Sequence, residues 1–229
     1  MDAQNRCLIC RKLISQFIKV KIYMSTDAQK FWDARFDTNE FLFGAEPNEF
    51  LKEASSKYLS GSLNVLCVAD GEGRNSVFLA KQGFRVTAFD ISPIAIEKSK
   101  KLSTGHNLNL KSFVADCDSW RWEEHSYDVV VAIFIQFAEP AMRKRLFKNM
   151  ISSLKPGGIL LLEGYTPKQL EYKTGGPGNI DNLYTKVMIL ELLSGLRIVE
   201  FMEHEKELNE GSHHKGRSAL MDVIAIKPN

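Results

Sequence analysis

Short apolar runs alternate with amphipathic stretches along most of the chain. The runs that predict β-strands are residues 64–69, 84–89, 110–115, 127–133 and 159–163, followed by 197–202 and 218–226. The central runs are apolar at nearly every position, as in strands whose two faces are both covered. Their alternation with helices is typical of a doubly wound α/β fold, in which helices lie on both faces of the sheet.

The stretches between these runs show helical periodicity. They predict helices over residues 47–59, 74–82, 93–102, 140–154 and 183–193. Ser92 can cap the helix that begins at Pro93, a residue favoured in a first helical turn. A further helix is expected to begin with Asp27 as its cap. The aromatic side chains that this helix would bury are Phe31, Trp32 and Phe36.

Residues 165–181 form the longest stretch without periodicity. This stretch contains Pro167, Gly175, Gly176, Pro177 and Gly178. A loop of this length within a compact domain is often a lid or a binding loop. A plain surface excursion is the alternative, and the sequence favours neither.

Length and composition indicate one ordinary folded domain. The chain has 229 residues, of which 44% are hydrophobic and 25% are charged, as is typical of globular proteins. Five of the 30 basic residues, but only one of the 28 acidic residues, lie in residues 1–24. The remaining body carries a formal charge of −2, which is unlike a protein that binds the phosphate backbone of nucleic acids. We therefore expect no nucleic-acid partner.

The basic N-terminal segment is separable from the rest of the chain. Met24 precedes a typical helix start at Asp27. Residues 1–23 are therefore interpreted as a basic extension, and 24–229 as one domain with a helical cap over about 24–60. The extension is either disordered or an upstream extension of the reading frame, with a membrane-surface helix or an organelle presequence as the alternative. No apolar run reaches about 18 residues, so we expect a cytoplasmic protein without a membrane partner.

The four cysteines offer no metal site. Cys7 and Cys10 form a single C-x-x-C, without the second pair of Cys or His ligands that a zinc site needs. Cys67 and Cys117 lie in apolar, strand-like segments and are interpreted as buried thiols. No metal ligand is therefore predicted.

The first predicted strand ends in a loop with the sequence Ala69-Asp70-Gly71-Glu72-Gly73. In a doubly wound sheet this loop lies in the crevice at the carboxyl ends of the strands, where ligands bind. The glycines allow a sharp turn and a close approach of the backbone to a ligand, and Ala69 can turn as well if its φ stays negative. The two carboxylates would repel the pyrophosphate of a dinucleotide and suit a cationic ligand.

Two more acids follow the next two predicted strands. Asp90, at the tip of the second strand, is placed to accept hydrogen bonds from both hydroxyls of a ribose, or to cap the next helix. Asp116, after the third strand, can accept from an adenine amino group or serve as a turn residue. Together with the acidic loop, they describe a pocket for an adenosine that carries a cationic, amino-acid-like tail. S-adenosylmethionine (SAM) has this structure and is the predicted cofactor.

At these motifs the sequence resembles the class I SAM-dependent methyltransferases. The resemblance covers residues 64 to about 226, and the turn at residues 155–158 matches the family's helix-to-strand turn. It implies a Rossmann-like, seven-stranded sheet of order 3-2-1-4-5-7-6 with the last strand antiparallel. Two positions depart from the common pattern, because Cys67 stands where the family carries an acid and Ala69 where it carries the first glycine.

The form of this loop is similar to that of a subgroup related to the tellurite-resistance methyltransferases. The segments that carry this resemblance are residues 69–75, 32–36, 43–47 and 209–216. The resemblance implies a small-molecule acceptor, although the name of the subgroup does not define the substrate.

The expected cofactor-binding residues follow from these motifs. They are Ala69, Asp70, Gly71, Glu72, Gly73, Arg74, Asn75, Asp90, Ile91, Ser92, Asp116, Cys117, Phe134, Trp32 and Arg35. Arg35 is either a partner of the methionine carboxylate or a solvated helix residue. No catalytic residue is assigned, and the candidates on the acceptor side are Tyr165, Tyr184 and His214. His214 can act as a base because imidazole titrates near neutrality, whereas adjacent histidines in a Gly- and Ser-rich stretch are more often part of a solvent loop.

The predicted activity is in-line methyl transfer from SAM to a small molecule, which needs positioning and exclusion of water more than a strong base. The segment after Ile133 lacks the Asp/Asn-Pro-Pro-Tyr-like tetrapeptide of N-methyltransferases. The acceptors considered are therefore a thiol and a chalcogen or metalloid oxyanion such as tellurite. A SAM-binding sensor without turnover and a nicotinamide-dependent oxidoreductase are the alternatives. The protein is expected to be a monomer or a homodimer.

Overall fold

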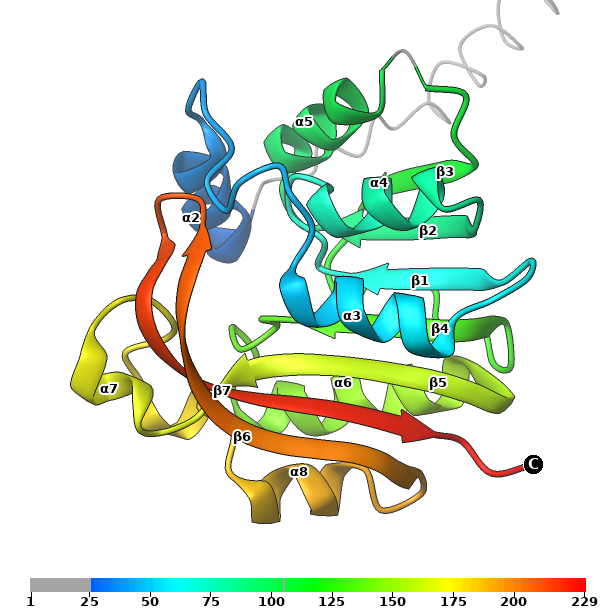
Figure 1. The fold of residues 1–229 in the computed structure, drawn as a ribbon. Helices are drawn as coiled ribbons and strands as arrows, with labels where there is room; N and C mark the ends of the chain where they lie inside the picture. Colours follow the sequence, from blue (N-terminus) through cyan, green and yellow to red (C-terminus); the bar gives the residue numbers. More distant parts are fainter. Residues whose placement is uncertain (1–25, 105) are drawn as a thin grey trace, which may run out of the picture.

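The computed structural model describes residues 26–104 and 106–229, and in this part of the chain seven strands form one sheet. The order is β3-β2-β1-β4-β5-β7-β6 (Figure 1). The strands are β1 (Asn64–Val68), β2 (Arg85–Asp90), β3 (Leu110–Val114), β4 (Tyr127–Ile133), β5 (Leu154–Tyr165), β6 (Arg197–Glu210) and β7 (His214–Ile226). The pairs from β3 to β5 are parallel, whereas β7 is antiparallel to β5 and to β6. The predicted strand order and antiparallel last strand are confirmed.

The helices alternate with the strands as the periodicity predicts. They are α2 (Asp27–Phe36), α3 (Glu49–Tyr58), α4 (Arg74–Lys81), α5 (Pro93–Ser103), α6 (Pro140–Ser153), α7 (Gln169–Tyr172) and α8 (Lys186–Leu192), with a 3-10 turn η1 (Ile180–Asn182). The Oγ of Ser92 accepts a hydrogen bond from the backbone N–H of Ala95 at 3.2 Å, which confirms the predicted cap of α5.

The central strands are apolar throughout because both faces of the sheet are covered. Val65 and Cys67 of β1 belong to a core that includes α3 and α4. Leu66 and Val68, which point to the opposite face, belong to a core that includes α6 and α8. Each side chain of this size stabilises the fold by about 1.5–3 kcal/mol when it is fully buried. The alternation of side chains along β1 therefore contributes to two cores at once.

The start of α2 differs from the prediction. Thr26, not Asp27, is the cap, since its Oγ1 accepts from the backbone N–H of Gln29. Asp27 lies in the first turn, where its negative charge suits the helix dipole. Phe36 is buried, but Phe31 is 55% exposed, so the predicted burial of Phe31 is wrong.

The last two strands are much longer than their apolar runs predict. Beyond the pair between Tyr165 of β5 and Leu220 of β7, the strands β6 and β7 pair only with each other, up to Glu210 opposite His214. The outer part of this ribbon is exposed on several positions and therefore polar in sequence. Its tip bends toward α2 (Figure 1), and the backbone N–H of Ser212 donates to the carbonyl of Leu42 at 3.1 Å.

Some predictions concern residues that the structure does not describe. The boundary proposed at residue 24 and the Cys7–Cys10 pair lie outside the described residues. Among residues 26–104 and 106–229, no helix is both long and apolar enough to cross a bilayer.

Gly73 provides a test of the loop packing. Its φ is +90°, and an added Cβ would lie 2.3 Å from the Oγ of Ser99 and 2.9 Å from the Cα of Ser99. Gly83 has a similar φ of +92° but open space around the same position. We expect Gly83→Ala to lower the free energy of unfolding by about 1–2 kcal/mol through backbone strain alone. Gly73→Ala should cost about 1–3 kcal/mol more through overpacking. Chemical denaturation of both variants measures the difference, and equal losses would contradict the close packing of α4 against α5.

Candidate functional site

A cavity of about 720 Å³ lies at the carboxyl ends of the parallel strands. The residues that line it from the strand ends include Ala69, Asp70, Gly71, Asp90, Ile91, Asp116, Cys117, Phe134 and Tyr165. The residues that line it from the covering segments include Trp32, Arg35, Phe43, Gly175, Gly176, Pro177, Gly178, His213 and His214. The volume falls within the range of about 300–1,000 Å³ that is usual for small-molecule sites.

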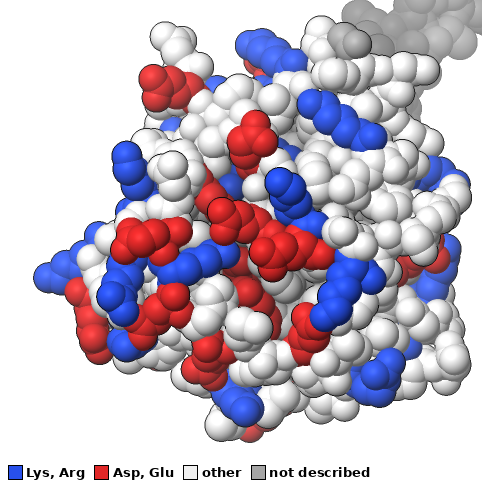
Figure 2. All heavy atoms as spheres, viewed as in Figure 1, with Lys and Arg blue, Asp and Glu red and all other residues white. Residues whose placement is uncertain are grey.

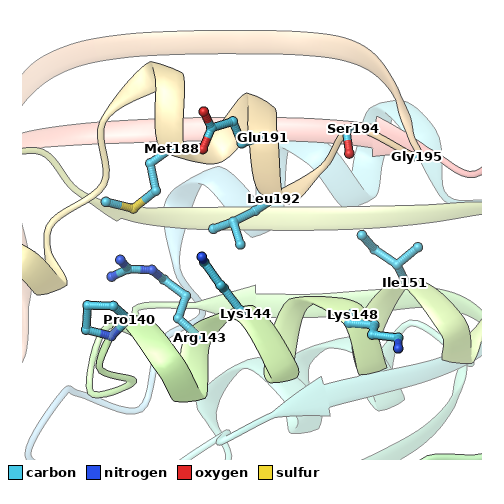
Figure 3. Close-up of a pocket in the computed structure, with 10 residues that line it drawn as sticks. All are labelled: Pro140, Arg143, Lys144, Lys148, Ile151, Met188, Glu191, Leu192, Ser194 and Gly195. Carbon is cyan, nitrogen blue, oxygen red and sulfur yellow. The ribbon is translucent and has the colours of Figure 1, made fainter.

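A second hollow of about 440 Å³ lies between α6 and α8 (Figure 3). Lys144 and Lys148 reach into it from α6, and Met188 and Leu192 from α8. The two lysines are exposed, and Arg143 donates to the carbonyl of Asp181. Buried polar groups without partners line the larger cavity instead, so we place the functional site there.

The loop after β1 turns through left-handed backbone conformations. The φ angles are +48° at Ala69, +59° at Gly71 and +90° at Gly73. The condition under which Ala69 was expected to turn without strain, a negative φ, is therefore not met, and this non-glycine residue holds a conformation that costs about 1–3 kcal/mol. The backbone N–H of Gly71 donates to the Oδ2 of Asp90 at 2.9 Å. The loop is thus fixed to the tip of β2, and it brings its backbone to the cavity.

Glu72 does not line the cavity. Its Oε2 accepts from the backbone N–H of Leu42 at 2.7 Å, and its Oε1 pairs with the Nζ of Lys98 at 2.7 Å. Its charge is thereby neutralised away from the cavity, so of the two loop carboxylates only that of Asp70 faces a ligand there. Gly73 and Ser92 are also absent from the lining, and they act on the site through the turn and the cap of α5.

Asp70 and Asp90 are buried carboxylates at the cavity. Burial raises the pKa of Asp70 to about 7 and that of Asp90 to about 6. The Oδ2 of Asp70 is buried without a hydrogen-bond partner in the structure. Both oxygens of Asp90 accept backbone N–H groups, from Gly71 and from Ser92. A cationic or hydroxyl-bearing ligand would favour the charged forms of these groups.

The segment after β3 lines the adjoining part of the cavity. The Oδ1 of Asp116 accepts from the backbone N–H groups of Asp118 and Ser119 at 2.8 and 2.7 Å. Asp116 therefore serves as a turn residue, as the alternative interpretation held, while it also lines the cavity. Cys117 is a buried thiol, as predicted, and burial raises its pKa to about 12. This thiol stays protonated at neutral pH.

Helix α2 covers one side of the cavity. The ring of Trp32 stacks on that of Phe36 with centroids 5.7 Å apart. The guanidinium of Arg35 lies 5.2 Å from the ring centre of Phe31, and its Nε is buried without a hydrogen-bond partner. Asp33 receives a hydrogen bond from the hydroxyl of Ser92. Helix α2 is thus attached to the tip of β2, and Arg35 lines the cavity.

Four rings form a box at the other end of the cavity. The imidazole of His214 lies 4.3 Å from Phe134, 4.4 Å from Phe43 and 5.8 Å from Tyr165, measured between ring centres. Phe134 stacks on Tyr165 at 4.8 Å and has a φ of +56°, a strained value for an aromatic residue. The hydroxyl of Tyr165 is buried without a partner. Two of the acceptor-side candidates, Tyr165 and His214, therefore meet in one place.

The third candidate does not reach this box. Tyr184 is fully buried beneath the site and packs against Phe147. A Cβ on Gly164 would lie 2.6 Å from its ring. Tyr184 therefore belongs to the core, and its hydroxyl does not line the cavity.

A buried polar cluster lies behind the imidazole. The Oε2 of Glu210 is 2.8 Å from the Nη1 of Arg74 and 3.8 Å from the Nδ1 of His214. Arg74 and Glu210 thus form a buried ion pair, and the Nδ1 of His214 makes no well-directed hydrogen bond among the described residues. Desolvation opposes ionisation of Glu210, but its contacts with His214 and Arg74 outweigh burial and lower its pKa to about 2. Burial lowers the pKa of His214, so its imidazole is neutral near pH 7.

Asn48 connects this cluster to the rest of the fold. Its Nδ2 donates to Glu163 at 2.8 Å and to Glu210 at 3.1 Å. Its Oδ1 caps α3 through the backbone N–H of Leu51, and its own N–H donates to Asn75. Asn48 and Glu163 are both fully buried. One side chain thus fixes the positions of β5, the β6–β7 ribbon and α3 relative to one another.

Sequence reasoning located the strand-end acids but missed Glu210 and Asn48. Glu210 lies just before the Gly-Ser turn of a polar ribbon, and Asn48 lies in a loop. No spacing rule joins these positions, because they meet only through pairing of β6 with β7. The signal for His214 was weak, and this residue is buried in the ribbon, not in a solvent loop.

A comparison with known families identifies the central segment. Residues 65–158 match a family model described as "Methyltransferase domain". The chain is 27% identical over 187 residues to the tRNA N(3)-methylcytidine methyltransferase Mettl2 of Drosophila melanogaster, with 70% of this chain and 55% of that protein covered. It is 32% identical over 136 residues to the probable thiol methyltransferase 2 of Arabidopsis thaliana, with coverage of 57% and 58%. The chain thus spans little more than half the length of these curated relatives.

Solved structures share the fold. TehB from Haemophilus influenzae has a TM-score of 0.63 at 18% identity, with 87% of this chain and 66% of that chain covered. The N-methyltransferase NodS from Bradyrhizobium japonicum WM9, in complex with S-adenosyl-L-homocysteine, has a TM-score of 0.67 at 16% identity, with coverage of 89% and 100%. Both likenesses agree with the resemblance that the sequence motifs indicated.

The matched segment contains the loop after β1, Asp90 and Asp116, and the sheet around it has the strand order expected of the class. The chain carries a methyltransferase domain. Its sheet has the fold of SAM-dependent methyltransferases of known structure, and the neighbour NodS was solved with S-adenosyl-L-homocysteine.

Asn48 gives a test of the buried network. We expect Asn48→Ala to lower the free energy of unfolding by about 3 kcal/mol, because buried acceptors lose their donor and α3 loses its cap. Asn48→Asp keeps the capping oxygen but replaces the donor with a carboxylate beside two others, so it should also destabilise. The control, Asn107→Ala at an exposed loop position, should change stability by less than about 0.5 kcal/mol. Denaturant unfolding checks all three, and wild-type stability of Asn48→Asp would contradict the donor role.

Proposed function

We propose that this protein transfers a methyl group from SAM to a small soft nucleophile, and that the acceptor is a thiol. The observation that carries the proposal is one continuous cavity with two different ends. One end has the strand-end carboxylates Asp70, Asp90 and Asp116, and the other has the box of four rings. The first end suits a nucleoside with a cationic tail, and the second suits an apolar acceptor.

The residues at the first end fit SAM. We assign Asp90 to the ribose hydroxyls and Asp116 to the adenine amino group. The unpartnered Oδ2 of Asp70 and the unpartnered Nε of Arg35 are a buried acceptor and a buried donor at the cavity. They suit the ammonium and the carboxylate of an amino-acid tail, respectively. Unlike a bare phosphate-binding loop, this arrangement offers one partner for each of the two charges of the amino-acid group.

The residues around the cavity need to do little chemistry. When bound, SAM supplies a methyl group that is already activated on a sulfonium. The box of Phe43, Phe134, Tyr165 and His214 would hold the acceptor and exclude water from it. The hydroxyl of Tyr165 is available to orient a polar group of the acceptor. The strained backbone of Phe134 brings its ring against two of these neighbours.

Two observations support a thiol as the acceptor. The box is apolar, its histidine is neutral near pH 7, and Arg74 beside it is paired with Glu210. Among the residues that the structure describes, the box itself therefore offers an oxyanion no unpaired cation. The similarity to a probable thiol methyltransferase of Arabidopsis thaliana points the same way. Thiolates are strong, soft nucleophiles for a methyl carbon.

A tRNA acceptor is the second candidate, because the fly relative is a tRNA methyltransferase. The expectation of no nucleic-acid partner is therefore not supported by the comparisons. On the face seen in Figure 2, acidic and basic side chains are interspersed, unlike the basic stripe usual for RNA binding. Parallel assays with radiolabelled SAM, one with a panel of small thiols and one with total tRNA, decide between the acceptors. Label in tRNA and none in the thiols would overturn the thiol proposal.

Asp90 tests the cofactor assignment. We expect Asp90→Asn to weaken SAM binding about tenfold or more, because charged hydrogen bonds to the ribose contribute about 1.5–3 kcal/mol. Asp90→Ala should weaken it further, since the loop also loses its contact with Gly71. Isothermal titration calorimetry measures the affinities. Asp118→Ala, at an exposed position outside the cavity, serves as the control. Unchanged affinity in both Asp90 variants would rule out the ribose role.

The raised pKa values predict pH-dependent binding. In the free protein the pKa of Asp70 is about 7 and that of Asp90 about 6. A bound cation lowers both, so below pH 7 binding must release a proton, and affinity falls as the pH falls. We expect the Kd for SAM to rise about tenfold from pH 8 to pH 6. Asp70→Asn should flatten this dependence above pH 6. A Kd that is constant over this range in the wild type would contradict the assignment of Asp70.

A further inference from the structure

The polar cluster at the acceptor end has an unusual composition for a buried site. It contains Arg74 from the start of α4, Glu210 from the end of β6 and His214 from the start of β7. All three side chains are less than 10% exposed. Purely structural clusters normally satisfy their buried hydrogen-bonding atoms. Here Arg74 and Glu210 pair with each other at 2.8 Å, whereas the Nδ1 of His214 has only the 3.8 Å approach to Glu210 and no well-directed partner. A buried imidazole with an incomplete set of hydrogen bonds calls for a functional explanation.

The arrangement leaves one nitrogen of His214 available. Glu210 lies on the Nδ1 side of the ring at 3.8 Å, so its carboxylate favours the tautomer with the proton on Nδ1. The lone pair then belongs to Nε2, which has no hydrogen bond among the described residues. The ring lines the cavity between Phe43 and Phe134. A neutral imidazole in this tautomer can take a proton at Nε2 from a molecule held among the rings of the box.

Other groups at this end cannot take the same role. Burial raises the pKa of Tyr165 far above its ordinary value, so its hydroxyl stays protonated and donates. Burial also raises the pKa values of Cys67 and Cys117. Three charged or titratable groups face His214. Glu210 on β6 favours the charged form of the imidazole, whereas Arg74 on α4 and the neighbouring His213 on the hairpin oppose that form. Tyr165 of β5 is neutral.

We propose that His214 is the general base that removes the proton of the thiol acceptor, with Glu210 and Arg74 as positioning residues. This inference rests on the proposed function. The S–H proton moves to Nε2, and the sulfur lone pair forms the new bond to the methyl carbon. The bond between that carbon and the sulfonium sulfur breaks, and its electron pair stays on the cofactor sulfur. The products are a methyl thioether, S-adenosylhomocysteine and a proton that leaves from the imidazolium to solvent.

A base is needed for some thiols and not for others, and this difference gives the test. An alkyl thiol with a pKa near 9 is mostly protonated at pH 7.5, whereas an aryl thiol with a pKa near 6 is already a thiolate. We expect His214→Ala and His214→Asn to lower kcat/KM about 100-fold or more for the alkyl thiol. For the aryl thiol the loss should be less than about fivefold, since no proton has to be removed. The loss for the alkyl thiol should shrink as the assay pH rises toward 9.5.

The controls separate catalysis from folding. Binding of S-adenosylhomocysteine, measured by calorimetry, should stay within about twofold of wild type in both His214 variants. His214→Asn retains an amide that can donate to Glu210, so it protects against collapse of the cluster. His106→Ala, on an exposed loop after α5, should behave as wild type. Equal losses of kcat/KM for alkyl and aryl thiols would contradict the assignment of His214 as the general base, and would indicate a packing role for this residue.

Glu210→Gln tests the positioning role independently. Loss of the carboxylate removes the group that raises the pKa of His214. The acidic limb of the kcat/KM profile should therefore move to lower pH, while kcat at the optimum falls. A lower kcat without movement of the limb would overturn the positioning role. A wild-type protein that fails to bind SAM would defeat the proposed function itself, whereas thiol turnover that does not depend on His214 would defeat only this inference.

Discussion

The hydrogen bonds of Asn48 are the constraint on which the site depends. A single buried amide joins the cap of α3 to Glu163 near the carboxyl end of β5 and to Glu210 at the end of β6. These three elements are far apart in the sequence, and hydrophobic burial alone does not fix their positions relative to one another along the strands. A directional interaction in a dry environment does so, because any slip would leave a buried carboxylate without its donor. The position of Glu210, and through it that of His214, follows from this register.

The two ends of the cavity therefore depend on different kinds of interaction. The cofactor end depends on the backbone: left-handed turns at Ala69, Gly71 and Gly73 bring the loop to the tip of β2, where Asp90 fixes it. The acceptor end depends on side chains that four separate segments bring together. It is closed by contact of the hairpin tip with the loop that holds Phe43. Strain at Ala69 and Phe134 is tolerated because the surrounding sheet determines both conformations.

Much of the fold can be predicted from the sequence, because most elements are marked by an apolar run or by a local capping residue. The central strands β1 and β4 are apolar on two faces, so their runs are visible, and the cap of α5 is local to Ser92 and Pro93. The ribbon of β6 and β7 lies beyond the sheet, so its outer half has polar positions and no run marks it. Glu72 was predicted to bind the cofactor because its spacing relative to the glycines is that of a ligand group. Contacts with Leu42 and Lys98, which are distant in sequence, turn its side chain away from the cavity.

The segments that cover the cavity all lie outside residues 65–158, the part that matches the methyltransferase domain. Helix α2, the loop with Phe43, the glycine-rich loop at residues 175–178 and the hairpin tip each line the cavity without forming part of the cofactor loop. Natural selection can therefore alter the acceptor half by insertion or substitution in these segments while the cofactor half stays unchanged. Divergence of substrate within such a lineage requires no change in the strand-end acids, and chains with nearly identical cofactor loops can act on chemically unrelated acceptors.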